Sequence, residues 1–228
     1  MKFVPDSWID SSPTKRWDAA LCLIAALFSV ACAGLLTTFS WGRDQSIYGL
    51  IGDGILKGQA PYRDLWDFKP PGIFFIYAGA QYLFGRSMAA IRVVEAFGLL
   101  GTVLGLVVLS KRLQGSTLAG WLAGGAATFA QVMLDFWHTG QPESFGGMLT
   151  VWALCATTPS DQKTTRQSAA FVAGALLGAA SLMKPPLGGA LIVVAAYLGR
   201  QRIEAVSLWK RLQPVSYTHL TLPTKRIV

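Results

Sequence analysis

Four aspartates and a lysine gather in residues 43–77, a short polar stretch between long apolar regions. They are Asp44, Asp53, Asp64, Asp67 and Lys69. Charged side chains beside or within a bilayer are costly, and for that reason they tend to mark substrate or ion sites. This stretch is therefore the part of the chain in which we expect chemistry.

Asp44 follows directly on the first apolar run, just beyond the membrane border that this run predicts. A carboxylate at this place can accept a proton from an incoming hydroxyl group and so act as a general base. The simpler alternative is that Asp44 only caps a helix at residues 44–56, and the two roles are compatible. Asp53, Asp64 and Asp67 are interpreted as solvated charges or partners of Arg63 and Lys69. Asp67 is also the best candidate of the three for substrate contact.

The tripeptide Lys-Pro-Pro occurs twice, beginning at Lys69 and at Lys184, and each copy stands at an expected membrane border. A lysine held before two prolines at a helix start suits the binding of a phosphate group. The alternative is that each lysine only extends to the membrane surface and anchors the end of its helix. The repetition favours the anion-binding interpretation for both lysines.

A polar turn at residues 137–143 separates two later apolar runs and ends in Glu143. Glu143 is either an acid of a substrate pocket or a residue that only benefits from the dipole at the start of the next helix. His138 in the same turn has no clear partner. The sequence therefore predicts no cofactor and no metal site, and it leaves metal dependence open.

Arg92 and Glu95 lie three residues apart, early in another apolar run. Two interpretations stand side by side. The residues pair with each other inside the membrane, or the spacing presents Arg92 to a ligand, which makes it a substrate-binding candidate.

The composition is that of a helical membrane protein. Of the 228 residues 52% are hydrophobic and 14% are charged, whereas average soluble domains carry about 25% charge. The net charge is +8, but the basic residues fall in short loops between apolar runs. This pattern is a topology signal and excludes a nucleic-acid-binding surface.

The apolar runs predict an all-α polytopic membrane protein with about six transmembrane helices and two interfacial helices in the first outer loop. The predicted spans are residues 18–39, 89–110, 118–135, 144–158, 168–183 and 187–199. The run at residues 72–84 is shorter than the roughly 20 residues that a span needs. We interpret it, together with the helix at residues 44–56, as interfacial.

Positive charge supports this interpretation of residues 72–84. If residues 72–84 do not cross the membrane, the basic loops that follow all fall in the cytoplasm, as the positive-inside rule requires. The tail at residues 1–17 is then cytoplasmic in a multi-pass protein of the inner (plasma) membrane. Residues 43–86, the turn at 137–143 and Lys184 then share the outer face. Three polar motifs that are far apart in sequence are thus expected to form one site.

Residues 18–213 are expected to form one membrane module. Residues 214–228 lack the preceding pattern and are interpreted as a non-native tail, which predicts that the chain is an N-terminal fragment of a longer protein. Small-xxx-small patterns begin at Gly101, Gly120 and Gly174, and each predicts a close helix contact.

The order of these features resembles the N-terminal module of the C-type membrane glycosyltransferases. That group includes protein O-mannosyltransferases, the aminoarabinose transferase of lipid A, and bacterial transferases that modify lipopolysaccharide cores. The matched motifs are Asp44-Gln45, Ile55-Leu56-Lys57-Gly58, Pro61-Tyr62-Arg63-Asp64, Asp67-Phe68-Lys69-Pro70-Pro71, Leu83-Phe84-Gly85, Arg92, the turn at 141–143 and Met183-Lys184-Pro185. They cover most of residues 17–199. Many members carry Asp-Glu where this chain has Asp44-Gln45.

The resemblance implies a cell-envelope glycosyltransferase that takes a sugar from a polyprenyl-phosphate donor. It implies that Asp44 is the catalytic base, that Lys69 and Lys184 lie near the donor phosphate, and that Glu143 matches a later family acid. We therefore expect transfer of a sugar to a hydroxyl group of a lipid, glycan or protein acceptor at the outer face. Acceptor-binding elements are expected beyond the fragment, so the fragment alone need not be active. The alternative function is a non-enzymatic membrane protein that binds or transports lipid phosphates.

Overall fold

The computed structural model describes residues 15–158 and 167–205. Within these residues the chain is helical, and its one β-type contact is an isolated bridge between Pro61 and Leu65. The prediction of an all-α fold is confirmed for this part of the chain. The predicted tail at residues 214–228, and most of the one at residues 1–17, lie outside the described residues.

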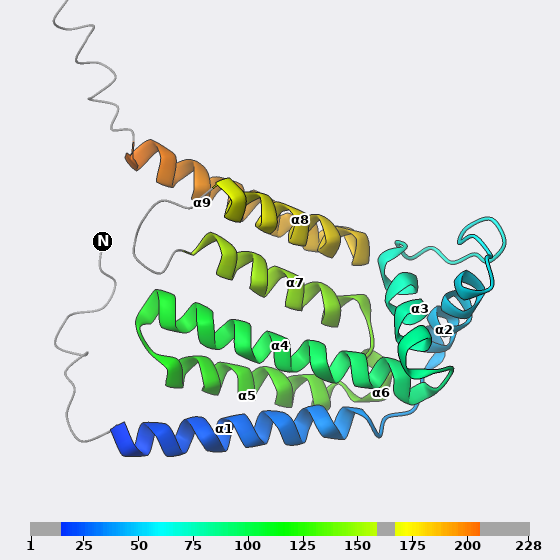
Figure 1. Cartoon of the computed structure of the whole chain (residues 1–228), viewed down its shortest axis with the longest axis horizontal. Helices are drawn as coiled ribbons and strands as arrows, with labels where there is room; N and C mark the ends of the chain where they lie inside the picture. Colours follow the sequence, from blue (N-terminus) through cyan, green and yellow to red (C-terminus); the bar gives the residue numbers. More distant parts are fainter. Residues whose placement is uncertain (1–14, 159–166, 206–228) are drawn as a thin grey trace, which may run out of the picture.

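The long helices run side by side in one bundle (Figure 1). They are α1 (Lys15–Leu36), α4 (Met88–Gln114), α5 (Thr117–Met133), α7 (Pro142–Thr157), α8 (Gln167–Met183) and α9 (Gly189–Ala205). Helix α1 packs on α5 and α4, α4 packs on α5 and α7, and α7 packs on α8. Helix α4 is therefore the central element of the bundle.

Two helices lie across one end of this bundle (Figure 1). They are α2 (Arg43–Leu56) and α3 (Gly72–Phe84), which pack against each other. The short helix α6 (Asp135–His138) connects α5 to α7, and the 3-10 turn η2 (Pro185–Gly188) connects α8 to α9. Because α3 does not run along the bundle axis, its placement is the one expected of an interfacial helix.

Two helices of the described part are long and apolar enough to cross a membrane by length and composition. They are α1 from Trp17 onward and α4. Three shorter apolar helices are Gly72–Phe84, Gln167–Met183 and Pro185–Gly199. Each of the six predicted spans coincides with a helix, and the number of spans stays a prediction.

Local sequence explains where α4 ends and α5 begins. Lys111 and Arg112 stand in the last turn of α4, where the helix dipole favours positive charge. Gly115 then adopts a left-handed φ of 72° as the C-cap of α4, a conformation that glycine reaches without strain. Ser116 caps α5 by accepting a hydrogen bond from the backbone N–H of Ala119. These residues fold α5 back against α4.

Helix α2 begins one residue earlier than predicted. Gly42 is its N-cap and Asp44 is its second residue, so the prediction that Asp44 caps the helix is wrong. The carboxylate still lies in the first turn, where the helix dipole favours negative charge. The predicted end is confirmed, because Lys57 is the C-cap and Gly58 follows with a φ of 81°.

Glycines set the close approach of α4 to its neighbours. A Cβ atom added at Gly120 would lie 2.5 Å from Cα of Val107, and one at Gly124 would lie 2.6 Å from Cγ1 of Val103. The predicted close contact is therefore confirmed for this pattern. It is wrong for the pattern that begins at Gly174, where an added Cβ meets no described atom within 4 Å.

We expect Gly120→Ala to destabilise the protein by about 1–3 kcal/mol, because the new methyl group must push the backbone of α4 away. Gly174→Ala is the matched control, and we expect it to be neutral or to stabilise by up to about 1 kcal/mol through helix propensity. Unfolding of the purified protein in detergent measures both changes. Equal stability of the two variants would contradict the packing described.

Candidate functional site

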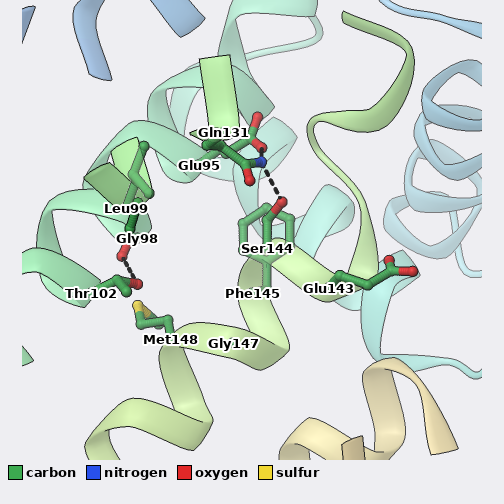
Figure 2. A pocket seen from close by; sticks show the side chains of 11 residues that line it. Glu95, Gly98, Leu99, Thr102, Gln131, Glu143, Ser144, Phe145, Gly147 and Met148 are labelled. Carbon is green, nitrogen blue, oxygen red and sulfur yellow. Dashed lines mark hydrogen bonds between the residues drawn. The ribbon is translucent and has the colours of Figure 1, made fainter. Parts of the chain in front are cut away.

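A cavity of about 170 Å³ lies between α4, α5 and α7 (Figure 2). Its polar wall includes Glu95, Gln131 and Ser144, and the Nε2 group of Gln131 donates a 2.8 Å hydrogen bond to the Ser144 hydroxyl. Glu143 also borders the cavity, but its side chain extends away from that of Met148 in Figure 2. The cavity therefore leads toward the predicted acids without enclosing their carboxylates.

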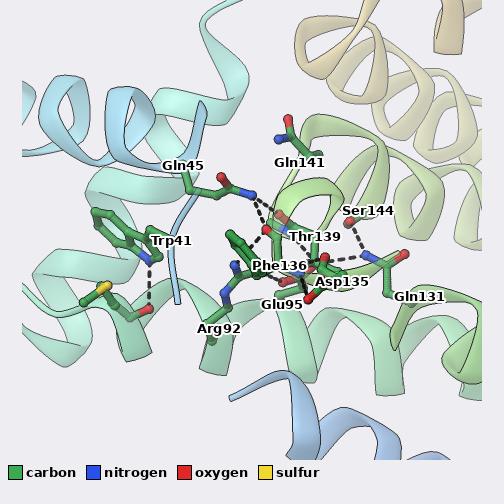
Figure 3. Close-up of polar contacts among 12 residues, drawn as sticks. Trp41, Gln45, Arg92, Glu95, Gln131, Asp135, Phe136, Thr139, Gln141 and Ser144 are labelled. Atoms are coloured by element: carbon green, nitrogen blue, oxygen red, sulfur yellow. Dashed lines mark hydrogen bonds and ion pairs between the residues drawn. The ribbon is translucent and has the colours of Figure 1, made fainter. Parts of the chain in front are cut away.

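A buried ion pair organises the bundle end above this cavity (Figure 3). Arg92 of α4 is 0% exposed and pairs with Glu95 at 3.0 Å. Arg92 also donates a 2.7 Å hydrogen bond to the Thr139 hydroxyl and further hydrogen bonds to the backbone oxygens of Ser40 and Phe136. These hydrogen bonds offset part of the cost of burying two charges, although the Nε atom of Arg92 has no hydrogen-bond partner among the described residues. These contacts agree with the interpretation that Arg92 and Glu95 pair with each other.

The pair fixes the turn at residues 137–143. The Oε1 atom of Glu95 accepts hydrogen bonds from the backbone N–H of Gly140 at 2.6 Å and from Gln131 at 3.0 Å. Gly140 has a φ of 67°, which favours glycine, and its carbonyl accepts a hydrogen bond from the Tyr77 hydroxyl of α3. The position of Glu143 therefore depends on contacts to α3, α4 and α5.

Gln45 connects α2 to the same turn. Its side chain is fully buried, and its Nε2 group donates to the backbone oxygens of Phe136 at 2.7 Å and Thr139 at 2.6 Å. A glutamate carboxylate has no N–H to offer these carbonyls. This is a physical reason for glutamine beside Asp44, and it holds the first turn of α2 against the turn at 137–143.

Tyr48 is a residue that the sequence analysis missed. It lies one helical turn after Asp44, is buried, and donates a 3.2 Å hydrogen bond to Oε1 of Gln141. Burial raises the pKa of Tyr48, and the negative charges of Asp44, Asp67 and Glu143 raise the pKa further. Carboxylates from three separate segments therefore act on one hydroxyl group. The i, i+4 spacing from Asp44 is the sequence signal that identifies it.

Two lysines lie near Glu143. Lys184, the N-cap of η2, forms an ion pair with Glu143, and both side chains are about half exposed. Burial acts to raise the pKa of Glu143, but the hydrogen bond from Lys184 and the charges of Lys184 and Lys69 lower the pKa below its ordinary value. Lys69 itself forms no ion pair with any residue that the structure describes, and its ammonium lies 5.2 Å from the centre of the Phe68 ring.

We call Asp44, Tyr48, Asp67, Lys69, Glu143 and Lys184 the polar rim. Of the six predicted site residues, Glu143 and Lys184 are in direct contact. The charges of Asp44, Asp67 and Glu143 act on Tyr48, and the charge of Lys69 acts on Glu143. Arg92, the sixth, lies beneath the rim and contacts its supporting turn. Asp67 is 8% exposed, and its carboxylate accepts a 2.8 Å hydrogen bond from the backbone N–H of Phe68.

The other two acids of the first loop are held by cations. The expected partner Arg63 holds Asp64, whereas Asp53 is held by two cations that were not expected. Asp53 is bridged by Lys57 at 2.7 Å and by Arg86 at 2.8 Å. Asp64 accepts two hydrogen bonds from Arg63, which lower the pKa of Asp64 to about 2. Both acids therefore have local structural roles.

A family model described as dolichyl-phosphate-mannose-protein mannosyltransferase matches residues 68–220, which is more than half of the chain. The chain belongs to this family. The resemblance to the C-type membrane glycosyltransferases is thereby confirmed. Membership implies a membrane setting and glycosyl transfer from a polyprenyl-phosphate donor. Searches of curated proteins and of solved structures found no match.

The family model covers only some residues of the polar rim of this glycosyltransferase. Lys69, Glu143 and Lys184 lie inside the matched range, whereas Asp44 and Asp67 precede it. Within the described residues no three His, Cys, Asp or Glu side chains form a group that would hold a metal ion. The described residues of the rim offer carboxylates, a tyrosine hydroxyl and two ammonium groups.

Proposed function

We propose that this chain belongs to a glycosyltransferase that moves a sugar from a polyprenyl-phosphate donor to an acceptor hydroxyl group at the outer face of the membrane. The observation that carries the proposal is the polar rim. Its carboxylates suit a base and sugar hydroxyls, and its lysines suit a phosphate. They come from four segments, and their charges act on Tyr48 and Glu143, which supports one shared site.

In this mechanism Asp44 accepts the proton of the acceptor hydroxyl. The acceptor oxygen bonds to the anomeric carbon as the bond between that carbon and the phosphate oxygen breaks. The electron pair passes to the phosphate, where Lys69 and Lys184 stabilise the developing charge. Attack from the face opposite the phosphate inverts the anomeric centre. The lipid phosphate is already a good leaving group, so a separate general acid is not required.

The remaining predicted residues have supporting roles in the proposal. Asp67 and Glu143 are substrate-binding acids, because carboxylates accept hydrogen bonds from sugar hydroxyls. Arg92 is a positioning residue, since its guanidinium contacts the turn that carries Glu143. Tyr48 keeps its proton through its raised pKa and donates a hydrogen bond to Gln141, which helps to hold the turn that carries Glu143.

The membrane orientation belongs to the same proposal. Helices α2 and α3 lie across the bundle end (Figure 1), and Trp66, Phe68 and Tyr82 expose large aromatic surfaces on this part of the chain. Aromatic side chains of this kind are enriched at membrane–water interfaces. We propose that the N-terminus is cytoplasmic and that the rim faces the opposite side, where the lipid headgroup of the donor lies.

We expect Lys69→Ala and Lys184→Ala each to weaken donor binding by about tenfold, the low end for a hydrogen bond to a charged group. Binding of a polyprenyl-phosphate sugar to the purified protein in detergent measures the effect. The matched control is Lys57→Ala, because Lys57 pairs with Asp53 away from the rim and Arg86 still holds that acid. Donor affinity that is equal in all three variants and the unmodified protein would contradict the proposed phosphate site.

A further inference from the structure

Glu143 places a negative charge beside the two lysines that are proposed to hold the donor phosphate. It forms an ion pair with Lys184, and the charge of Lys69 also acts on its carboxylate. The side chains of Glu143 and Lys184 are 50% and 43% exposed, so a lipid phosphate can reach the pair. Any phosphate that binds Lys184 must therefore share that lysine with Glu143 or displace it.

The lipid substrate and the lipid product of sugar transfer differ in the charge of their phosphate group. The donor is a phosphodiester with one negative charge. When the bond from the anomeric carbon to the phosphate oxygen breaks, the electron pair stays on the phosphate and the acceptor proton passes to Asp44. The released lipid is a phosphate monoester, which carries about 1.5 to 2 negative charges near neutral pH because its second pKa is about 6.

We infer that Glu143 is a specificity-determining residue that makes the rim prefer the singly charged donor over the more highly charged product lipid. This inference rests on the proposed function. The Glu143 carboxylate repels each negative charge on a bound phosphate, so it weakens the binding of the monoester more than that of the diester. For charges about 6 Å apart in a partly hydrated site, one extra charge changes the affinity roughly three- to tenfold.

The repulsion between Glu143 and the product phosphate also helps the product lipid to leave. After transfer the two lysines hold a lipid with more negative charge than the one they bound, and attraction alone would retain it. Glu143 offsets part of that attraction and can return to its ion pair with Lys184 as the product leaves. Glu143 thereby favours exchange of the product lipid for a new donor.

The test compares two probes that carry the same isoprenoid chain, an isoprenyl monophosphate and its methyl phosphodiester. Dissociation constants are measured for the purified protein in detergent, for Glu143→Gln, and for Glu143→Asp, which keeps the charge. At about pH 7.5, where the monoester is largely doubly charged, we expect Glu143→Gln to tighten monoester binding roughly three- to tenfold more than diester binding. Glu143→Asp should keep the preference of the unmodified protein.

A pH shift and a control variant sharpen the comparison. At about pH 5 the monoester carries roughly one charge, and Glu143 remains ionised because its pKa lies below the ordinary value. The difference between the probes should then nearly vanish. Asp64→Asn is the matched control, since Asp64 pairs with Arg63 outside the rim, and it should leave the ratio of the two affinities unchanged.

Two results overturn the inference in distinguishable ways. If Lys69→Ala and Lys184→Ala weaken both probes while Glu143→Gln changes both equally, the phosphate site stands and the role of Glu143 is wrong. If the lysine variants change neither probe, the phosphate site of the proposed function is wrong, and the inference falls with it. Unfolding temperatures of all variants show that each protein is folded when its affinities are compared.

Discussion

Replacing Asp44 with asparagine is expected to reduce the rate of sugar transfer by about 10²- to 10⁴-fold, the usual contribution of a general base. Asparagine keeps the shape of the side chain but cannot accept the acceptor proton. Lys69 and Lys184 are unchanged, so donor binding should persist. Transfer of a labelled sugar from a polyprenyl-phosphate donor, measured in membranes that contain the protein, gives the rate, and a binding assay gives the affinity.

The control for this substitution is Asp64→Asn. Asp64 lies in the same loop, but it pairs with Arg63 and caps the backbone at Ala60. We expect the sugar-transfer rate of Asp64→Asn to stay within about twofold of the rate of the unmodified protein, because most exposed substitutions away from a site have small effects. Unchanged transfer in Asp44→Asn would remove Asp44 from the mechanism. Normal binding in a protein that never transfers sugar would favour the non-enzymatic alternative.

Replacing Arg92 with alanine is expected to destabilise the fold by about 3–5 kcal/mol. The reason is that Glu95 would keep a buried charge without its partner. The turn at 136–139 would also lose the two hydrogen bonds that the guanidinium donates to Phe136 and Thr139. Such a loss is a large share of the stability of most proteins, which is about 5–15 kcal/mol. Unfolding of the purified protein in detergent measures it.

The control is Arg86→Ala, whose guanidinium is largely exposed and shares Asp53 with Lys57. It should cost about 1 kcal/mol or less. The double substitution Arg92→Met with Glu95→Leu removes both buried charges and should recover much of the stability. Because it still removes the hydrogen bonds that Arg92 and Glu95 make to Thr139 and Gly140, transfer should remain impaired. Full recovery of transfer in this variant would show that the pair only stabilises the fold and does not position the rim.

The main helices could be predicted from the sequence because their signals are local. The apolar runs gave every long helix of the described part, and Gly115 with Ser116 marks the reversal between α4 and α5. The short run at Gly72–Phe84 was expected to be interfacial. It forms a helix that lies across the bundle end in Figure 1, and its place relative to the membrane stays a prediction. The errors concern contacts that depend on neighbours, such as the open surroundings of Gly174.

The contacts around the site depend on residues that are far apart in sequence. Lys69, Glu143 and Lys184 were expected to share one side of the membrane. Glu143 and Lys184 form an ion pair, and the charge of Lys69 acts on Glu143. Tyr48 and Gln45 were missed as functional residues because nothing in the local sequence shows that α2 packs against the 137–143 turn. The catalytic roles of the rim residues stay predictions.

The central claim is that the rim lies on one side of the membrane, opposite the cytoplasm, and cysteine labelling in intact cells tests it most directly. Cys22, Cys32 and Cys155 are first replaced with alanine, and single cysteines are placed by Lys69→Cys, Glu143→Cys and Lys184→Cys, with Gln114→Cys at the far end of α4 as the control. An impermeant thiol reagent should label the three rim positions from outside and reach position 114 only after the cells are opened. Labelling of position 143 only in opened cells would contradict the account, because Asp44 and Glu143 would then not share an outer site.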